Sequence, residues 1–152
     1  MVARSHGVDH RSFAPLPPGR LFWTSAAAKD CFFDRLLSFG DVEGIELEEG
    51  LPPVANPSRE RIHLGRFDES FQPGKSYLLI LMLDVLEHLP KPASALQHVR
   101  RLLAPGGVSL ATVPAFQLLW TNHDVIHHHF QRYSAMTLRP LIESAKHSVI
   151  AS

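Results

Sequence analysis

The sequence has only one cysteine, no excess of either charge, no signal peptide and no long apolar run. The single cysteine, Cys31, excludes an internal disulfide framework and a cysteine-rich zinc module. The 15 Lys and Arg residues balance the 15 Asp and Glu residues, which leaves no net field to hold a nucleic-acid backbone. The longest apolar run, Tyr77–Leu83, is far shorter than the roughly 20 residues that cross a bilayer. We therefore expect a soluble, cytoplasmic protein with neither a nucleic-acid nor a membrane partner.

The composition is that of one folded domain with an unusual histidine content. Hydrophobic residues make up 45% and charged residues 20% of the 152 positions, enough to bury a core in a single domain. Ten histidines are present, several times an average share, and they cluster in the last third of the chain. The histidines of that last third are therefore candidate ligands.

The hydrophobic pattern predicts a parallel α/β sheet with crossover helices. Residues 1–20 show no helical or strand period and are expected to be an extension or a lead-in loop. Ser76–Leu83 is the strongest signal, because a continuous apolar run of this length is typical of a strand buried on both faces. The predicted elements, in chain order, are a helix at Phe32–Leu37, strands at Val42–Leu47, Arg61–Phe67 and Ser76–Leu83, a helix at Pro92–Leu103, a strand at Val108–Val113, an irregular stretch over 115–133 and a helix at Thr137–Ala145. The last helix is predicted to have Thr137 as its cap and Pro140 in its first turn.

Ligands of open α/β sheets bind beyond the carboxyl ends of the strands. An acidic residue that ends the second strand of such a unit can accept hydrogen bonds from both hydroxyls of a ribose, and Glu46, at the end of the predicted strand Val42–Leu47, is a candidate for that residue. The alternative is a solvated turn carboxylate beside Glu48 and Glu49. The pattern alone leaves both interpretations open.

A longer segment, LDVLEHLPKPASALQHVRRLLAPGGVSLATVPAF, resembles the class I S-adenosylmethionine-dependent methyltransferases. It is similar to the segment after the family's fourth strand, the next helix and the LxPGG turn into strand five, and the likeness extends over about 32–145. The resemblance implies a Rossmann-like sheet over 21–152. Because the family adds two strands beyond the last predicted helix, we expect that sheet to be truncated and incomplete at its carboxyl-terminal end.

The resemblance also implies a set of site residues. On the cofactor side, it places the ribose on Glu46, the adenine near Phe67 and Asp68, and the methionine end along Leu83 and Asp84. On the acceptor side, it places Glu87 and His88. His88 is a candidate base, and the alternative is that it is a packed, hydrogen-bonded histidine with a structural role.

The chain departs from the family where the glycine-rich loop belongs. That loop lets the backbone approach the cofactor without Cβ clashes, yet LFWTSAAAKDC at Leu21–Cys31 contains no glycine. Codons chosen for this segment, read from their third base, encode VLDVGCGKGL, which matches the family's first strand and loop. Two compensating frameshifts are therefore our hypothesis for 21–31, and an unrelated Ala-rich helix is the alternative.

The stretch TNHDVIHHHFQRY is rich in histidine. His123 and His127 have the spacing of one helical face, and zinc accepts His and Asp ligands. However, no His-Glu-x-x-His pattern is present, and similar family members carry a comparable segment over the acceptor site. We therefore predict substrate-side or structural roles and no metal ligands. The residues concerned are His123 as a second candidate base, with Asp124, His127, Arg132 and Tyr133 on the substrate side.

Together these features predict methyl transfer from S-adenosylmethionine to a small-molecule acceptor. The missing glycine loop predicts that the chain as it stands binds this cofactor poorly or not at all. Two alternatives remain, which are a non-catalytic methyltransferase-like remnant and a histidine-based metal protein. The sequence identifies neither the acceptor nor the oligomeric state.

Overall fold

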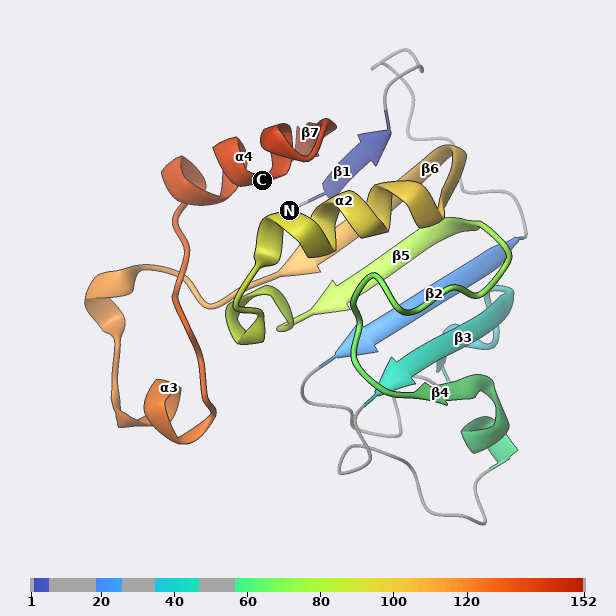
Figure 1. Ribbon diagram of the computed structural model, residues 1–152, viewed down its shortest axis with the longest axis horizontal. Helices are drawn as coiled ribbons and strands as arrows, with labels where there is room; N and C mark the ends of the chain where they lie inside the picture. The colour runs from blue at the N-terminus through green and yellow to red at the C-terminus, as the bar shows by residue number, and fades with distance from the viewer. Residues whose placement is uncertain (1, 6–18, 26–34, 47–56, 152) are drawn as a thin grey trace.

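A computed structural model describes residues 2–5, 19–25, 35–46 and 57–151 (Figure 1). They build one seven-stranded sheet in the order β4-β3-β2-β5-β6-β1-β7. Neighbours among β2 to β6 run parallel, and β1 is antiparallel to both β6 and β7. The strands are β1 Val2–Ser5, β2 Arg20–Ser25, β3 Asp41–Glu46, β4 Ile62–Leu64, β5 Tyr77–Leu83, β6 Leu103–Thr112 and β7 His147–Ala151.

Two helices contact the sheet and each other, while a third lies beyond the ends of β5 and β6 (Figure 1). Helix α2 contacts β6 and α4, and α4 contacts β7. Short 3-10 turns complete the described part. The helices are α2 Pro92–Leu102, α3 Asn122–Ile126 and α4 Ala135–Ser144, and the 3-10 turns are η2 Pro57–Arg61, η3 Leu86–His88 and η4 Gln117–Leu119. No helix in the described part of the chain is long and apolar enough to span a membrane.

The predicted parallel α/β sheet with a crossover helix is confirmed, with corrected boundaries. Strand β6 begins at Leu103 rather than Val108, and β4 keeps only the middle of the predicted 61–67 strand. The first half of the predicted Phe32–Leu37 helix lies outside the described residues, as does the segment after Ser25 that should carry the glycine loop.

The start of α4 is a second correction. The helix begins at Ala135 after Ser134, so Thr137 is its third residue rather than its cap. The backbone N–H of Ser134 donates to Thr137 Oγ1 at 2.9 Å, and this capping box fixes the helix start one turn early. Pro140 consequently lies inside the helix and not in its first turn.

Strands β1 and β7 have no signal in the sequence. The expectation of a lead-in loop is wrong for residues 2–5, because β1 inserts between β6 and β7 and pairs with both. Val2 lies opposite Leu110 and Ala3 opposite Ser109. Four residues are too few to show a strand period, so these backbone hydrogen bonds across the sheet decide the conformation.

The core forms on both faces of β5. Ile80 and Met82 are buried in a large cluster that α2 and α4 help to cover, whereas Leu81 packs with Val42 in a smaller cluster. This alternation between two apolar faces confirms the predicted doubly buried strand. Packing on both faces therefore fixes the position of β5, including its carboxyl end.

Pro105-Gly106-Gly107 lies inside β6, at the register shift between the pairs Tyr77–Leu103 and Leu79–Val108, and it requires its two glycines for different reasons. Gly106 has a φ of +75°, in the left-handed region that favours glycine. At Gly107 an added Cβ would lie 2.9 Å from the carbonyl oxygens of both Ala104 and Tyr77. The segment thus lets β6 approach the start of β5 more closely than a side chain would allow.

A buried carboxylate links three elements of the sheet. Glu43 on β3 is 8% exposed and pairs with Lys75, with His63 Nε2 at 3.1 Å and with the Tyr77 hydroxyl at 3.4 Å. Burial raises the pKa of Glu43, but the hydrogen bonds and charges of Lys75 and His63 outweigh this, so the net pKa lies below 4.5. The ionised form therefore stabilises the fold.

We expect Glu43→Gln to lower the free energy of unfolding by about 1.5–3 kcal/mol at pH 7, the contribution of hydrogen bonds to a charged group. Because the folded pKa of Glu43 is below its ordinary 4.5, this contribution is present above pH 4.5 and is lost as the pH falls below it. Urea unfolding at pH 7 and pH 3 measures both effects. Glu60→Gln, at an exposed carboxylate, is the control, and a loss independent of pH would contradict the prediction.

Candidate active site at the carboxyl ends of the strands

The sheet has a topological switch point beside β2. From β2 the chain adds β3 and β4 on one side, then crosses back to place β5 and β6 on the other. Ligands of open α/β sheets bind in the crevice at such a point, beyond the carboxyl ends of the strands. In this chain the crevice lies past Ser25 and Leu83, which are opposite each other at the ends of β2 and β5.

The first group of predicted cofactor residues lies along β3 and β4. Glu46 is the last residue of β3 and is 7% exposed, and its carbonyl accepts a 3.0 Å hydrogen bond from Gly65 beyond β4. The prediction of a strand-end acid is thus confirmed in position, and a solvated turn carboxylate is excluded by its burial. Phe67 lies inside the core, 5.4 Å from the His98 ring, so its side chain does not line an open surface.

Asp68 has a local partner. Its carboxylate accepts hydrogen bonds from the Ser70 hydroxyl at 2.6 Å and from the Ser70 backbone N–H at 2.9 Å. These bonds lower the pKa of Asp68, which is exposed. The turn keeps this carboxylate ionised next to the end of β4.

The end of β5 holds an unusual backbone conformation. Asp84 has a φ of +53°, which is uncommon for a residue other than glycine. Its N–H donates to the carbonyl and hydroxyl oxygens of Thr112, and the Thr112 hydroxyl donates back to Asp84 Oδ1 at 3.0 Å. These bonds hold Asp84 in place beyond the carboxyl end of β5, next to the topological switch point. Strained residues of this kind concentrate at functional sites.

The turn after Asp84 contains a buried carboxyl group. Glu87 is 1% exposed, and its Oε2 atom has no hydrogen-bond partner among the residues that the structure describes. Burial, with a smaller contribution from the charge of Asp84, raises the pKa of Glu87 to about 7. The neighbouring His88 is half-buried, and its pKa is lowered by burial and by His129. His88 is thus neutral at pH 7 and able to accept a proton.

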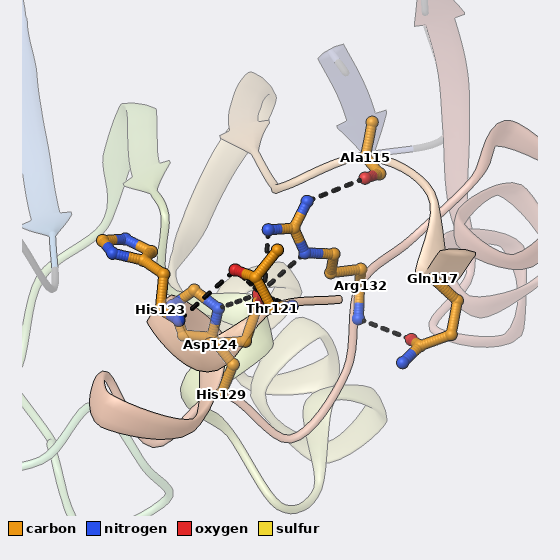
Figure 2. Close-up of polar contacts among 7 residues, drawn as sticks. All are labelled: Ala115, Gln117, Thr121, His123, Asp124, His129 and Arg132. Atoms are coloured by element: carbon orange, nitrogen blue, oxygen red, sulfur yellow. Dashed lines mark hydrogen bonds and ion pairs between the residues drawn. The ribbon is translucent and has the colours of Figure 1, made fainter. Parts of the chain in front are cut away.

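Residues 115–133 form a polar segment organised by one buried carboxylate, shown in Figure 2. Asp124 is 0% exposed and accepts bonds from Arg132 Nε at 2.7 Å and Nη2 at 3.0 Å. It also pairs with His129 Nδ1 at 2.9 Å and accepts from the Thr121 N–H at 2.7 Å. The hydrogen bonds of Arg132 hold the pKa of Asp124 well below its usual range.

This segment docks on the turn after β5. The Phe130 N–H donates to the Glu87 carbonyl at 2.6 Å, and the Tyr133 hydroxyl donates to the Leu86 carbonyl at 3.2 Å. The ring centroids of His88 and His129 lie 4.5 Å apart at 89°. Tyr133 is 4% exposed in the core, and burial raises its pKa to about 12. Tyr133 therefore contributes to a site by holding segment 115–133 in position and not by exchanging a proton.

The two remaining predicted histidines lie on the exposed side of the segment. His123 and His127 are exposed, with ring centroids 4.1 Å apart, as the helical spacing suggests. Both rings lie more than 6 Å from the His129 ring, at 6.3 Å and 6.2 Å. The structure therefore separates them from the buried part of the site.

Sequence reasoning missed two residues of this arrangement. Thr112 fixes Asp84, and the only signal for it was its place at the end of a neighbouring parallel strand. His129 links Asp124 to the His88 ring. Its signal was the histidine run itself, which does not show which of three adjacent rings turns inward.

The sheet order, the switch point and the acidic strand ends define the Rossmann-like fold of class I methyltransferases. A family model described as "Methyltransferase domain" matches residues 19–151. The chain therefore belongs to this methyltransferase domain family. No curated protein matches the sequence closely enough to be counted as a relative.

Solved structures of low sequence identity share this fold. A candidate methyltransferase from Bacillus halodurans C-125 matches with a TM-score of 0.63 and 18% identity over 87% of this chain and 64% of that chain. A candidate methyltransferase in complex with the Haloferax volcanii Trm112 methyltransferase activator matches with a TM-score of 0.62 and 19% identity, covering 86% and 62% of the two chains. This chain thus spans less than two thirds of the length of either protein.

A third structure contains the cofactor. It is a glycopeptide N-methyltransferase complexed with S-adenosylmethionine, with a TM-score of 0.50 and 19% identity over 69% of this chain and 51% of that chain. That glycopeptide N-methyltransferase thus binds S-adenosylmethionine on a fold that this chain shares. In this chain the buried carboxylate Glu46 ends β3, the kind of place where a strand-end acid accepts ribose hydroxyls, whereas residues 21–31 contain no glycine.

Proposed function

We propose that this chain is the cofactor-binding part of a methyltransferase that acts on a small-molecule acceptor, with its cofactor loop impaired. The observation that carries the proposal is the buried Glu46 at the end of β3, beside the switch point of a family-matched sheet. A strand-end acid at this place accepts two ribose hydroxyls. Asp84, fixed at the end of β5, lies at the methionine side.

The chemistry then divides between the cofactor and the chain. When bound, S-adenosylmethionine supplies a methyl group on a sulfonium, and transfer depends mainly on proximity and orientation. The chain's own task is to orient the acceptor and remove its proton. His88 is the favoured base because it is half-buried and neutral at pH 7, and the exposed His123 is the alternative.

The segment 115–133 supplies the acceptor side. It lies beyond the ends of β5 and β6 and is fastened to the turn that carries Glu87 and His88. The Asp124–Arg132 pair keeps its backbone in place. The mixed charge of the chain favours a small acceptor over a nucleic acid. A cytoplasmic location stays a prediction.

The test of this function is cofactor binding by a chain in which 21–31 is replaced with VLDVGCGKGL. In that background we expect Glu46→Gln to weaken S-adenosylmethionine binding about 10- to 100-fold, the effect of losing hydrogen bonds of about 1.5–3 kcal/mol to a charged acceptor. Isothermal titration calorimetry measures it. The matched control is Glu60→Gln, which removes an exposed carboxylate in η2. Equal affinities for both variants would contradict the ribose role of Glu46.

A further inference from the structure

We propose that Glu87, His88 and His129 form a binding site for a divalent transition-metal ion. Each residue offers one ligand atom, and these atoms all lie within 4.8 Å of one another. The site joins the turn after β5 to the docked segment 115–133. It differs from the histidine pair His123–His127 that the sequence suggested, and it replaces the expectation that the chain has no metal ligands. An ion held here occupies the lone pair of His88, so the base role proposed above for His88 belongs to the ion-free chain, and the alternative base His123 takes that role when the ion is bound.

The first argument is the buried carboxylate. Glu87 is 1% exposed, yet its Oε2 atom has no hydrogen-bond partner in the described structure. Leaving a buried polar atom without a partner is costly, and buried charges are normally paired or coordinate metals. The described groups near Glu87 include the Asp84 carboxylate, which adds negative charge. A cation is the partner that this arrangement lacks.

The second argument is the orientation of His129. Its Nδ1 atom lies 2.9 Å from Asp124 Oδ1. Asp124 is itself fixed by two bonds from Arg132 and so remains a hydrogen-bond acceptor. Nδ1 must therefore carry the proton, which leaves the Nε2 lone pair free as a ligand. Metal-ligating histidines almost always have a carboxylate or carbonyl on the other ring nitrogen in this way.

The third argument is the position of His88. Its ring meets that of His129 edge to face, at 4.5 Å and 89°. Ligands about 2.1 Å from a tetrahedral ion are separated by roughly 3.4 Å, so the three side chains must converge by about 1 Å on binding. His88 is half-buried, so its ring can make most of this movement, while the His129 side chain, 10% exposed, stays on Asp124.

The ligand set selects the class of metal. Two imidazoles and one carboxylate suit zinc, cobalt, nickel and ferrous iron, whereas magnesium and calcium prefer oxygen ligands. Three protein ligands also leave a coordination position open.

The site is tested by titrating the chelator-treated full chain with Co²⁺, followed by its visible absorption, and with Zn²⁺, followed by calorimetry. We expect one ion per chain with micromolar affinity. Glu87→Gln, His88→Ala and His129→Ala should each weaken binding by more than about 30-fold, because each removes a direct ligand, and Asp124→Asn by about 10-fold or more. Mg²⁺ should give no saturable signal.

His123→Ala and His127→Ala are the matched controls, since they remove histidines of the same segment outside the ligand set. We expect both to bind within about threefold of the unmodified chain. Circular dichroism shows which variants are folded, and an increase in melting temperature with Zn²⁺ that His129→Ala lacks gives a second measure. Loss of binding in the controls but not in Glu87→Gln, or no saturable binding by the unmodified chain, would overturn the proposal. No cofactor or acceptor is present, so the outcome is independent of methyl transfer.

Discussion

Replacing Leu21–Cys31 with VLDVGCGKGL is expected to raise the affinity for S-adenosylmethionine at least about 100-fold, from a dissociation constant of about 1 mM or weaker to about 10 μM or tighter. Such a change corresponds to about 3 kcal/mol or more. The segment begins within β2, whose residues pair with both β3 and β5, and the carboxyl end of β2 at Ser25 lies at the switch point. Glycines there allow the backbone to approach the methionine part of the cofactor, whereas Cβ atoms would occupy the same space.

The control for this replacement is the same segment with its three glycines changed to alanine, VLDVACAKAL. It keeps the length and the strand residues and removes only the conformational freedom and the space. We expect it to bind as weakly as the unmodified chain. Micromolar binding by the unmodified chain, or no gain on replacement in a folded protein, would show that the glycine-loop argument is wrong.

The source DNA provides a separate test of how residues 21–31 arose. The frameshift hypothesis requires codons that encode a glycine-rich segment when read from their third base. The Asp of that segment follows from Trp23 and Thr24 alone, because their codons fix its three bases. Codons that encode no glycines in the shifted frame would rule the hypothesis out.

Tyr133→Ala is expected to lower the free energy of unfolding by about 3–5 kcal/mol, as for other large aromatic side chains removed from a core. Tyr133 is 4% exposed, and its backbone forms a bridge to Ala115. Its hydroxyl reaches the Leu86 carbonyl. The Tyr133 side chain thus holds the acceptor-side segment 115–133 against the core. Its loss should therefore also speed amide hydrogen exchange at Phe116 and Phe130.

The conservative variant separates packing from hydrogen bonding. Tyr133→Phe keeps the ring and removes only the hydroxyl, and we expect it to cost about 1 kcal/mol. Urea unfolding gives the two free energies, and hydrogen exchange gives the local effect. Similar losses for both variants, or a loss below about 1 kcal/mol for Tyr133→Ala, would contradict a role for the ring as anchor.

The sequence was most informative where one local signal dominates. The apolar run at Ser76–Leu83 predicts β5 because a segment buried on both faces has no polar residue to interrupt it. The apolar stripe and leading proline predict α2 to within a residue at its end. Glu46 could be placed at a strand end because the alternating segment Val42–Leu47 runs into the acidic turn Glu48-Glu49-Gly50. Each of these patterns is complete within a dozen residues.

The tertiary structure alone decided which distant residues meet. Strand β1 exists only because β6 and β7 offer it backbone partners, and the Asp84–Thr112 bonds depend on the register of β5 and β6. The pairing of His129 with Asp124, and the approach of His129 to Glu87 and His88, depend on how segment 115–133 docks on the turn after β5. The sequence by itself determined the fold class, the central strand, the main helix and the acidic strand end, since local periodicity and spacing encode them. The composition of the buried polar site was set by contacts between segments far apart in the chain, which no local pattern records.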